Sequence, residues 1–283
     1  MTRMHLTDLL AASRRTAFAG LAKNTGKTTA LVSALTGLSE GRRFVGITSL
    51  GRDGEEWDVL DRDVGKPRIW LPLASVVATT DVLWQRSGLR YETLHVTDYR
   101  TPLGRVVIGR VLTPGHVEVA GPSTAAQLRT VIDAITGVGI DHLLLDGSIN
   151  RRIGCSPALV DGVVLATGAV VDQNPAGVAR HTRRAADLLR LPPVTDTRVR
   201  AAAAGRATPA LLPDDGEPIP LPARLPLAAD AGDLGEVFRP HPGHCRLLLP
   251  GALCESFLRR VADSRRGRPI TFVVVDSTKV LLP

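Results

Sequence analysis

The chain of 283 residues has few of the residues on which disulfide-bonded, zinc-binding and membrane-spanning proteins depend. Its three cysteines, Cys155, Cys245 and Cys254, form no Cys-x-x-Cys pair, which argues against a disulfide framework and a cysteine-based zinc site. No apolar run reaches the length of a transmembrane helix, and residues 9–12 are too few for the apolar core of a signal peptide. We therefore expect a cytoplasmic protein with reduced thiols and no membrane association.

Aromatic residues are also scarce, at 4 %, although hydrophobic residues make up 44 % of the chain. A core built mainly from Val, Leu, Ile and Ala is typical of a parallel α/β sheet. The net charge of +7 would suit a nucleic-acid or anionic-lipid partner. The arginine pairs are scattered, however, and no aromatic residues lie between them to stack on bases. We therefore favour arginines spread over solvated surfaces and a negatively charged nucleotide ligand, and we do not expect nucleic acid as a partner.

Lysine is rare as well, because only four of the 35 basic residues are lysines. Where arginine has replaced lysine almost everywhere, the remaining lysines are expected at places that need a compact ammonium group rather than a planar guanidinium. Two of the four, Lys23 and Lys27, lie close together in the sequence. This spacing directs attention to the segment that contains them.

The segment around these two lysines predicts a strand, a loop and a helix. Residues 16–19 end the strand, residues 20–26 form the loop, and the helix begins at Lys27 with apolar residues at helical spacing. A phosphate chain needs donors on many sides, which successive backbone N–H groups and the positive end of a helix supply. Gly26 permits close backbone approach, Lys27 can reach the β- and γ-phosphates, and the Thr28 hydroxyl can complete a Mg²⁺ shell. The predicted nucleotide-binding residues are Ala22, Lys23, Asn24, Thr25, Gly26, Lys27, Thr28 and Thr29.

The loop departs from the usual phosphate-binding motif at one position. The first glycine is expected five residues before Gly26, where the chain has Leu21, and Gly20 stands one residue too early. The alternative is an ordinary turn and helix start that happens to contain Gly-Lys-Thr. The strand before the loop and the helix after it favour a phosphate-binding loop.

Two aspartates follow apolar strands and are candidate partners of this loop. Asp53 comes after the predicted strand 44–50, where it could hold Mg²⁺ through water or orient an attacking water; the alternative is a plain turn. Asp146 ends the apolar run 142–146 and precedes a glycine, in the Walker-B form, so it would meet the Mg²⁺ that Thr28 also touches. We predict Lys27 and Asp53 as catalytic residues and Thr28, Asp53 and Asp146 as metal ligands. Residues 148–152 are either a nucleotide-responsive switch or a polar loop.

The remaining pattern predicts an α/β fold of the P-loop NTPase type, with a mostly parallel sheet and flanking helices. Two or three of the strands predicted between residues 75 and 120 are expected to pair antiparallel as an edge extension. A further buried strand, 162–168, and an arginine-rich helix, 175–191, complete a nucleotide-binding domain of residues 1–191. Residues 192–242, rich in Pro, Ala and Asp, are expected to be a linker or irregular covering segment. Residues 243–283 are predicted to form a small C-terminal α/β appendage of βαβ type.

The loop resembles that of a P-loop class that includes dethiobiotin synthetases and molybdopterin-guanine-dinucleotide chaperones. The similarity lies in residues 22–29, Ala-Lys-Asn-Thr-Gly-Lys-Thr-Thr. It implies nucleotide binding across a possible homodimer, in which a loop lysine touches the partner's phosphates. Lys23 is offset from the position of that lysine in the family pattern.

A wider resemblance is to the large subunit of lysine 5,6-aminomutase reactivase. It rests on residues 20–29, on 46–55 (Gly-Ile-Thr-Ser-Leu-Gly-Arg-Asp-Gly-Glu) and on five short motifs. These motifs begin at Lys66, Thr101, Ala120, Leu145 and Pro250. The resemblance implies an ATPase that acts with a small reactivase subunit to restore an adenosylcobalamin-dependent aminomutase. The arginine-rich helix and the segment 192–242 have no counterpart in this resemblance.

Three functions are therefore open. The first is an ATPase that remodels or reactivates a partner enzyme, the second a nucleotide-dependent small-molecule ligase or kinase, and the third a GTP-dependent cofactor or metal chaperone. The Asn/Thr-Lys-x-Asp motif that reads guanine is missing, since Thr278-Lys279 is followed by Val-Leu, so ATP is favoured over GTP. Residues 241–245, His-Pro-Gly-His-Cys, carry ligand-type side chains, but their proline and glycine favour a surface loop over a metal site.

Overall fold

The computed structural model describes residues 5–51, 68–147, 152–221, 231–265 and 267–282. The chain forms two compact units, Met1–Ala186 and Asp187–Pro283. The boundary lies within the helix α5 (Pro175–Leu189), which begins in one unit and ends in the other, whereas the predicted boundaries are at 191 and 242.

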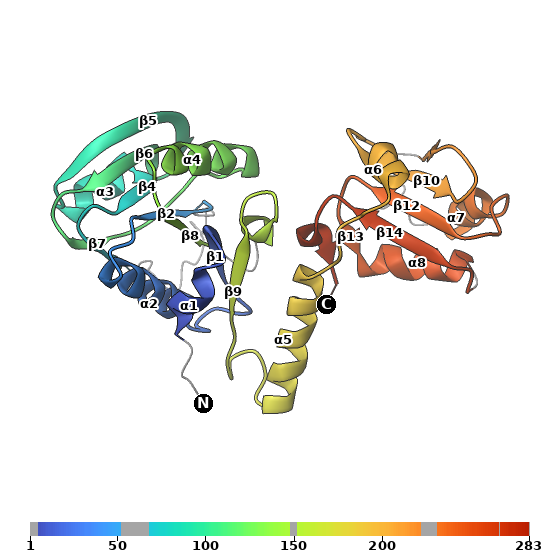
Figure 1. Ribbon diagram of the computed structural model, residues 1–283. Coiled ribbons are helices and arrows are strands. Elements are labelled where there is room, and N and C mark those ends of the chain that lie inside the picture. The colour runs from blue at the N-terminus through green and yellow to red at the C-terminus, as the bar shows by residue number, and fades with distance from the viewer. Residues whose placement is uncertain (1–4, 52–67, 148–151, 222–230, 266, 283) are drawn as a thin grey trace. The chain divides into compact units, whose positions relative to one another are not determined.

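The first unit is built on a seven-stranded sheet with the order β5-β6-β4-β2-β8-β1-β9 (Figure 1). All strand pairs from β4 to β9 are parallel, whereas β6 pairs antiparallel with β4 and with β5. The predicted α/β class, with a mostly parallel sheet and an antiparallel extension at one edge, is confirmed. The strands are β1 (Arg15–Gly20), β2 (Val45–Ser49), β4 (Val76–Thr80), β5 (Tyr91–Thr101), β6 (Gly104–Val111), β8 (His142–Asp146) and β9 (Gly162–Ala166).

Helices cover both faces of this sheet, and Figure 1 shows α2 (Lys27–Glu40) and α4 (Ala125–Gly137) on opposite sides of it. The buried face of α2 consists of leucines and an alanine at helical spacing, and they pack on Phe18, Ile47 and Leu144. The Thr124 hydroxyl accepts a hydrogen bond from the Gln127 N–H and so caps the start of α4. The shorter helices are α1 (Leu6–Leu10) and α3 (Asp81–Ser87).

Two strands, β7 (Gly115–Val117) and β9, differ in their pairing or burial from what the sequence predicts. The strand β7 does not join the large sheet but pairs antiparallel with β3 (Ile69–Leu71). The strand β9, predicted to be buried, is only half-buried because it forms one edge of the sheet. An apolar run predicts a strand, but its neighbours in the sheet decide how deeply it is buried.

The end of β2 is held by a close approach between two backbone segments. The Gly51 N–H donates to the Pro122 carbonyl at 2.8 Å, and a Cβ on Gly121 would lie 1.7 Å from the Ser49 carbonyl oxygen. No side chain fits at Gly121 unless one of the two segments moves. Glycine is therefore required at this position by packing.

We expect Gly121→Ala to lower the free energy of unfolding by about 2–3 kcal/mol, because the added methyl group must displace the backbone at the end of β2. Gly137→Ala is the matched control, since no atom lies within 4 Å of the added Cβ at the end of α4. The control should be neutral or stabilise the protein by up to about 1 kcal/mol. Urea denaturation of both variants measures the difference, and equal stabilities would contradict the packing argument.

The second unit contains a four-stranded sheet with the order β11-β10-β12-β14. The predicted βαβ unit is present, since β12 (Cys245–Leu249) pairs parallel with β14 (Ile270–Val274) and α8 (Glu255–Arg265) connects them. Two short strands, β13 (Leu253–Cys254) and β15 (Val280–Leu281), pair beside them. The sheet is completed by β10 (Ala210–Pro213) and β11 (Ile219–Pro220).

The segment 192–242, expected to be a linker or irregular cover, contains regular elements of this unit. It includes α6 (Thr197–Ala203), α7 (Ala231–Phe238) and the strand β10, which pairs antiparallel with β12. The proline-rich composition suggested irregular structure. A strand is nevertheless possible here, because β10 is only four residues long and its proline is the last of them. Its pairing with a distant strand, and not its local sequence, stabilises it.

Arg265 is the largest polar side chain buried in the second unit, with 2 % of its surface exposed. Its guanidinium donates to the carbonyl oxygens of His241, Gly243 and Pro269 at 2.8, 2.6 and 2.8 Å. The same guanidinium lies over the Phe238 ring, 5.3 Å from its centre. One side chain thus ties α8 to the loops that precede β12 and β14.

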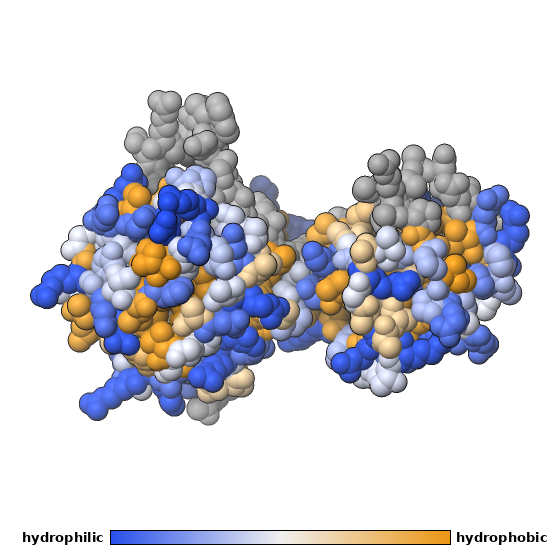
Figure 2. Space-filling view, turned by 90° about the horizontal axis from the view of Figure 1, so that it is seen from above, coloured by the Kyte–Doolittle hydropathy of each residue, from blue (hydrophilic) through white to orange (hydrophobic). Residues whose placement is uncertain are grey.

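The described helices include none that is both long and apolar enough to cross a bilayer. Figure 2 shows hydrophilic and hydrophobic residues interspersed over the viewed face of each unit.

Candidate functional site

The loop at residues 21–26 joins the end of β1 to the start of α2. The Leu21 N–H donates to the Ala166 carbonyl at 2.9 Å, which extends the pairing of β1 with β9 by one step. Two residues of the loop have left-handed backbones, Asn24 with φ 61° and Gly26 with φ 85°. Left-handed residues next to residues of ordinary φ are the backbone pattern of anion-binding turns.

The displaced glycine of this loop has a structural reason. A Cβ on Gly20 would lie 2.5 Å from the Thr25 hydroxyl oxygen, which itself donates to the Ala22 carbonyl at 3.0 Å. Leu21, at the position where the usual motif has glycine, does not have a positive φ. The loop therefore needs a glycine one position earlier than the usual spacing, and it tolerates a side chain at Leu21.

Lys27 is the first residue of α2, and it reaches the neighbouring strand β8. Its Nζ donates to the Gly147 carbonyl at 2.7 Å and lies 2.5 Å from Asp146 Oδ1. Both side chains are largely enclosed, with 24 % of Lys27 and 11 % of Asp146 exposed. An ammonium and a carboxylate in this setting are screened less by water than a surface pair.

The sheet order explains why these two residues meet. In the parallel pairing of β1 with β8, Phe18 is aligned with Asp146, and the Gly147 N–H donates to the Phe18 carbonyl at 2.9 Å. The loop after β1 and the residues after β8 therefore lie side by side at the carboxyl ends of their strands. In parallel α/β sheets, ligands bind at the carboxyl ends of the strands.

The other predicted residues of the loop lie around this pair. Thr28 and Ala22 are half-buried, while Lys23, Asn24 and Thr29 are exposed. Within the described chain no hydrogen bond joins Thr28 to Asp146. The predicted contribution of Asp53 and most of the predicted switch 148–152 lie outside the described residues.

The oxygen donors here suit a hard cation. The Thr28 hydroxyl and the Asp146 carboxylate are oxygen ligands of the kind that Mg²⁺ takes, together with phosphate oxygens and water. The described part of the chain holds no group of three or more His, Cys, Asp or Glu side chains that could bind a metal ion by themselves. A Mg²⁺ ion at this site would therefore depend on phosphate oxygens for part of its coordination.

One partner of Lys27 was missed in the sequence, namely the carbonyl of Gly147. The glycine that follows Asp146 belongs to the Walker-B form, which assigns no role to its backbone oxygen. A Cβ on Gly147 would lie 3.0 Å from the Phe18 carbonyl oxygen, so close packing against β1 favours glycine there. The sequence thus shows the Asp-Gly pair, but only the order of the strands in the sheet shows that the Gly147 carbonyl meets Lys27.

No protein-family model, curated protein or solved structure matches this chain, so its functional assignment depends on the geometry of the loop and of the two strands beside it.

Proposed function

We propose that the chain binds ATP with Mg²⁺ at the loop of residues 21–29 and hydrolyses it, as a P-loop NTPase. The observation that carries the proposal is the contact of Lys27, at the start of α2, with Asp146 and Gly147 at the end of β8. A lysine and an aspartate of the two expected motifs lie within one ion-pair distance although 119 positions separate them in the sequence. An ordinary helix start does not require such a pair.

The chemistry assigned to each group follows from charge. The Lys27 ammonium would exchange its contacts with Gly147 and Asp146 for β- and γ-phosphate oxygens, and so stabilise charge that develops during phosphoryl transfer. Backbone N–H groups of residues 22–28 and the positive end of α2 would bind the phosphate chain. Thr28 and Asp146 would hold Mg²⁺, which neutralises phosphate charge when it is bound. Asp53 remains the proposed residue for positioning water.

We further propose that hydrolysis is coupled to remodelling of a partner enzyme. The support is the resemblance of residues 20–29, 46–55 and the shorter motifs to the aminomutase reactivase large subunit. The proposed partners are a small reactivase subunit and an adenosylcobalamin-dependent aminomutase, and nucleotide binding across a homodimer remains part of the proposal. Hydrolysis that is slow alone and faster with the partner would support this coupling.

The test of the site uses Asp146→Asn, which removes the carboxylate charge with little change in shape. Wild-type protein should bind ATP more tightly with Mg²⁺ than without it. In the variant the gain from Mg²⁺ should fall by about tenfold or more, because a charged ligand of the ion is lost. Titration calorimetry with ATP, with and without Mg²⁺, measures both values.

The matched control is Asp133→Asn, which removes an exposed carboxylate from α4. It should leave the Mg²⁺ effect unchanged. Wild-type protein that binds neither ATP nor GTP would refute the proposed function. An undiminished Mg²⁺ effect in Asp146→Asn would refute only the role of that residue.

A further inference from the structure

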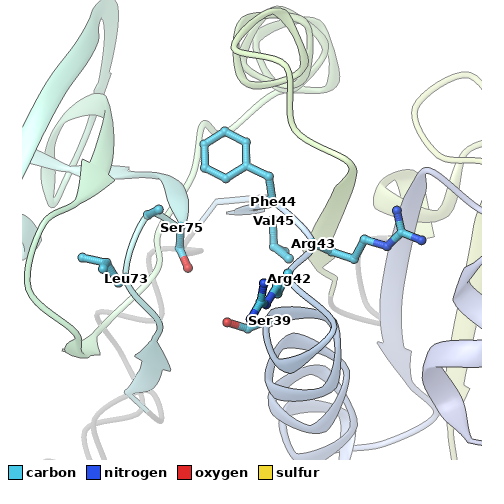
Figure 3. A pocket seen from close by; sticks show the side chains of 8 residues that line it. Ser39, Arg42, Arg43, Phe44, Val45, Leu73 and Ser75 are labelled. Atoms are coloured by element: carbon cyan, nitrogen blue, oxygen red, sulfur yellow. The ribbon is translucent and has the colours of Figure 1, made fainter.

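A cavity of about 200 Å³ opens in the first unit at the ends of the strands opposite to those near Lys27 (Figure 3). It is lined by the start of β2, at Val45, and by the residues that precede β4, up to Ser75. Since β2 and β4 run parallel to β1, these are the amino ends of the strands, whereas the loop of residues 21–26 follows a carboxyl end. The helix α2 connects the two sets of strand ends, and its 14 residues span about 21 Å.

The backbone around this cavity is unusual. Arg42 and Ala74, which both line it, have left-handed conformations with φ 55° and 66°. In the described chain the only other residue besides glycine with a positive φ is Asn24, in the loop beside Lys27. The two conformations at the cavity have local causes. Arg42 follows the C-cap of α2, where the Arg43 N–H donates to the Leu38 carbonyl at 2.9 Å. Ala74 lies in a turn in which the Ser75 N–H donates to the Pro72 carbonyl at 3.4 Å. The helix end and the turn together fix the shape of the cavity wall.

Two hydroxyl groups of the cavity wall lack partners. Ser75 is only 4 % exposed, yet among the described residues its hydroxyl has no hydrogen-bond partner, and the same is true of the Ser39 hydroxyl. Figure 3 shows the Ser75 hydroxyl directed into the gap that separates it from Ser39 and Arg42. Neither hydroxyl is among the fully buried polar atoms of the described chain, so both face the open volume of the cavity and can donate to a bound acceptor.

Two exposed arginines at the cavity have guanidinium groups without a protein partner among the described residues. Neither the Arg42 nor the Arg43 guanidinium forms an ion pair or hydrogen bond with another described residue. In Figure 3 the Arg42 side chain lies beside Ser39, whereas Arg43 extends away. The nearby Arg110 differs, because it pairs with Glu92 at 3.0 Å while its guanidinium lies over the Phe44 ring. Arg42 is thus the cation available to a ligand.

We propose that this cavity binds a small anion, in which a phosphate or carboxylate group meets Arg42 and the hydroxyls of Ser39 and Ser75. A guanidinium and two hydroxyls form a set of donors that fits either group. The volume excludes a whole nucleotide but admits a compact anion with a short apolar body, which would pack on Leu73 and Val45. The site is separate from the proposed ATP site and does not depend on it.

The experiment is a two-dimensional ¹H–¹⁵N NMR titration of the full chain with inorganic phosphate and, separately, with malonate. We expect saturable shifts of the amides of residues 41–45 and 74–76 with at least one of the two anions. Arg42→Gln should weaken this binding by about tenfold or more, and Ser75→Ala by about threefold to tenfold. If only phosphate binds, the site recognises a phosphate group of its ligand, and if malonate binds, it recognises a carboxylate group.

The matched control is Arg200→Gln, which removes an exposed arginine of α6 in the other unit and should leave the affinity unchanged. Shifts confined to residues 21–29 would overturn the inference, and so would shifts that do not saturate. An equal loss of affinity in Arg42→Gln and Arg200→Gln would also overturn it. Because amide shifts at the two sites are observed separately, failure at this cavity leaves the ATP proposal untouched.

Discussion

Replacing Lys27 by methionine is expected to lower ATP turnover by about 10²–10³-fold, because the side chain keeps its unbranched form and most of its length but loses the charge that meets the phosphates. In the structure its ammonium is already directed at the end of β8, 2.7 Å from the Gly147 carbonyl. No neighbouring group on the same helix turn can replace it, since Thr28 and Thr29 are neutral. Release of inorganic phosphate, measured with saturating ATP and Mg²⁺, gives the turnover of both proteins.

The matched control is Lys23→Met, which removes the same charge from the exposed part of the same loop. We expect it to cost less than tenfold when the protein acts alone. Tryptophan emission and circular dichroism of both variants show whether the fold is retained. Equal turnover in wild type and Lys27→Met would refute the P-loop mechanism, and an equal loss in both lysine variants would show that general electrostatics and not Lys27 supports the reaction.

Replacing Arg265 by leucine is expected to destabilise the second unit by about 3–5 kcal/mol. The substitution leaves the carbonyl oxygens of His241, Gly243 and Pro269 without their charged donor in a buried place. The loss of the contact with the Phe238 ring adds to this cost. Since all four partners belong to Asp187–Pro283, we expect this unit to unfold first.

The positions of the tryptophans make this prediction measurable. All three, at residues 57, 70 and 84, belong to the first unit, so their fluorescence reports that unit alone. In urea the variant should lose part of its circular dichroism at lower denaturant concentration, with an unchanged fluorescence midpoint. Arg259→Leu on the same helix is the control, because its exposed ion pair with Glu255 is worth less than about 0.5 kcal/mol. If the fluorescence midpoint fell to the same urea concentration as the early change in circular dichroism, the two units would unfold together, which would contradict the prediction.

Local patterns were sufficient to predict the elements around the loop. The change from an apolar run to Gly-Lys-Thr-Thr placed the start of α2 at Lys27, where it is observed. The run that ends at Asp146 was likewise predicted with the bounds that β8 has. Both predictions depend on residue type and spacing within about ten positions, which a sequence displays directly.

Features that depend on distant partners were not predictable in this way. The strand β10 is stabilised by its pairing with β12, which lies more than 30 positions away in the sequence. Its proline-rich surroundings alone suggested a linker. The cavity at Arg42 and Ser75 combines the end of α2 with the residues before β4, and no motif marks either side. The early glycine of the loop became explicable only when the position of the Thr25 hydroxyl was known.

The hydrogen bond between Lys27 and Gly147 also bears on how the protein is made. Its partners are 120 positions apart in the chain. At a synthesis rate of about 5–20 residues per second, roughly 6–24 s pass between the two residues. The strand β1 must wait about as long for β8, its neighbour in the sheet. On the ribosome, the first helix and its loop therefore exist for many seconds before the second half of their site has been synthesised.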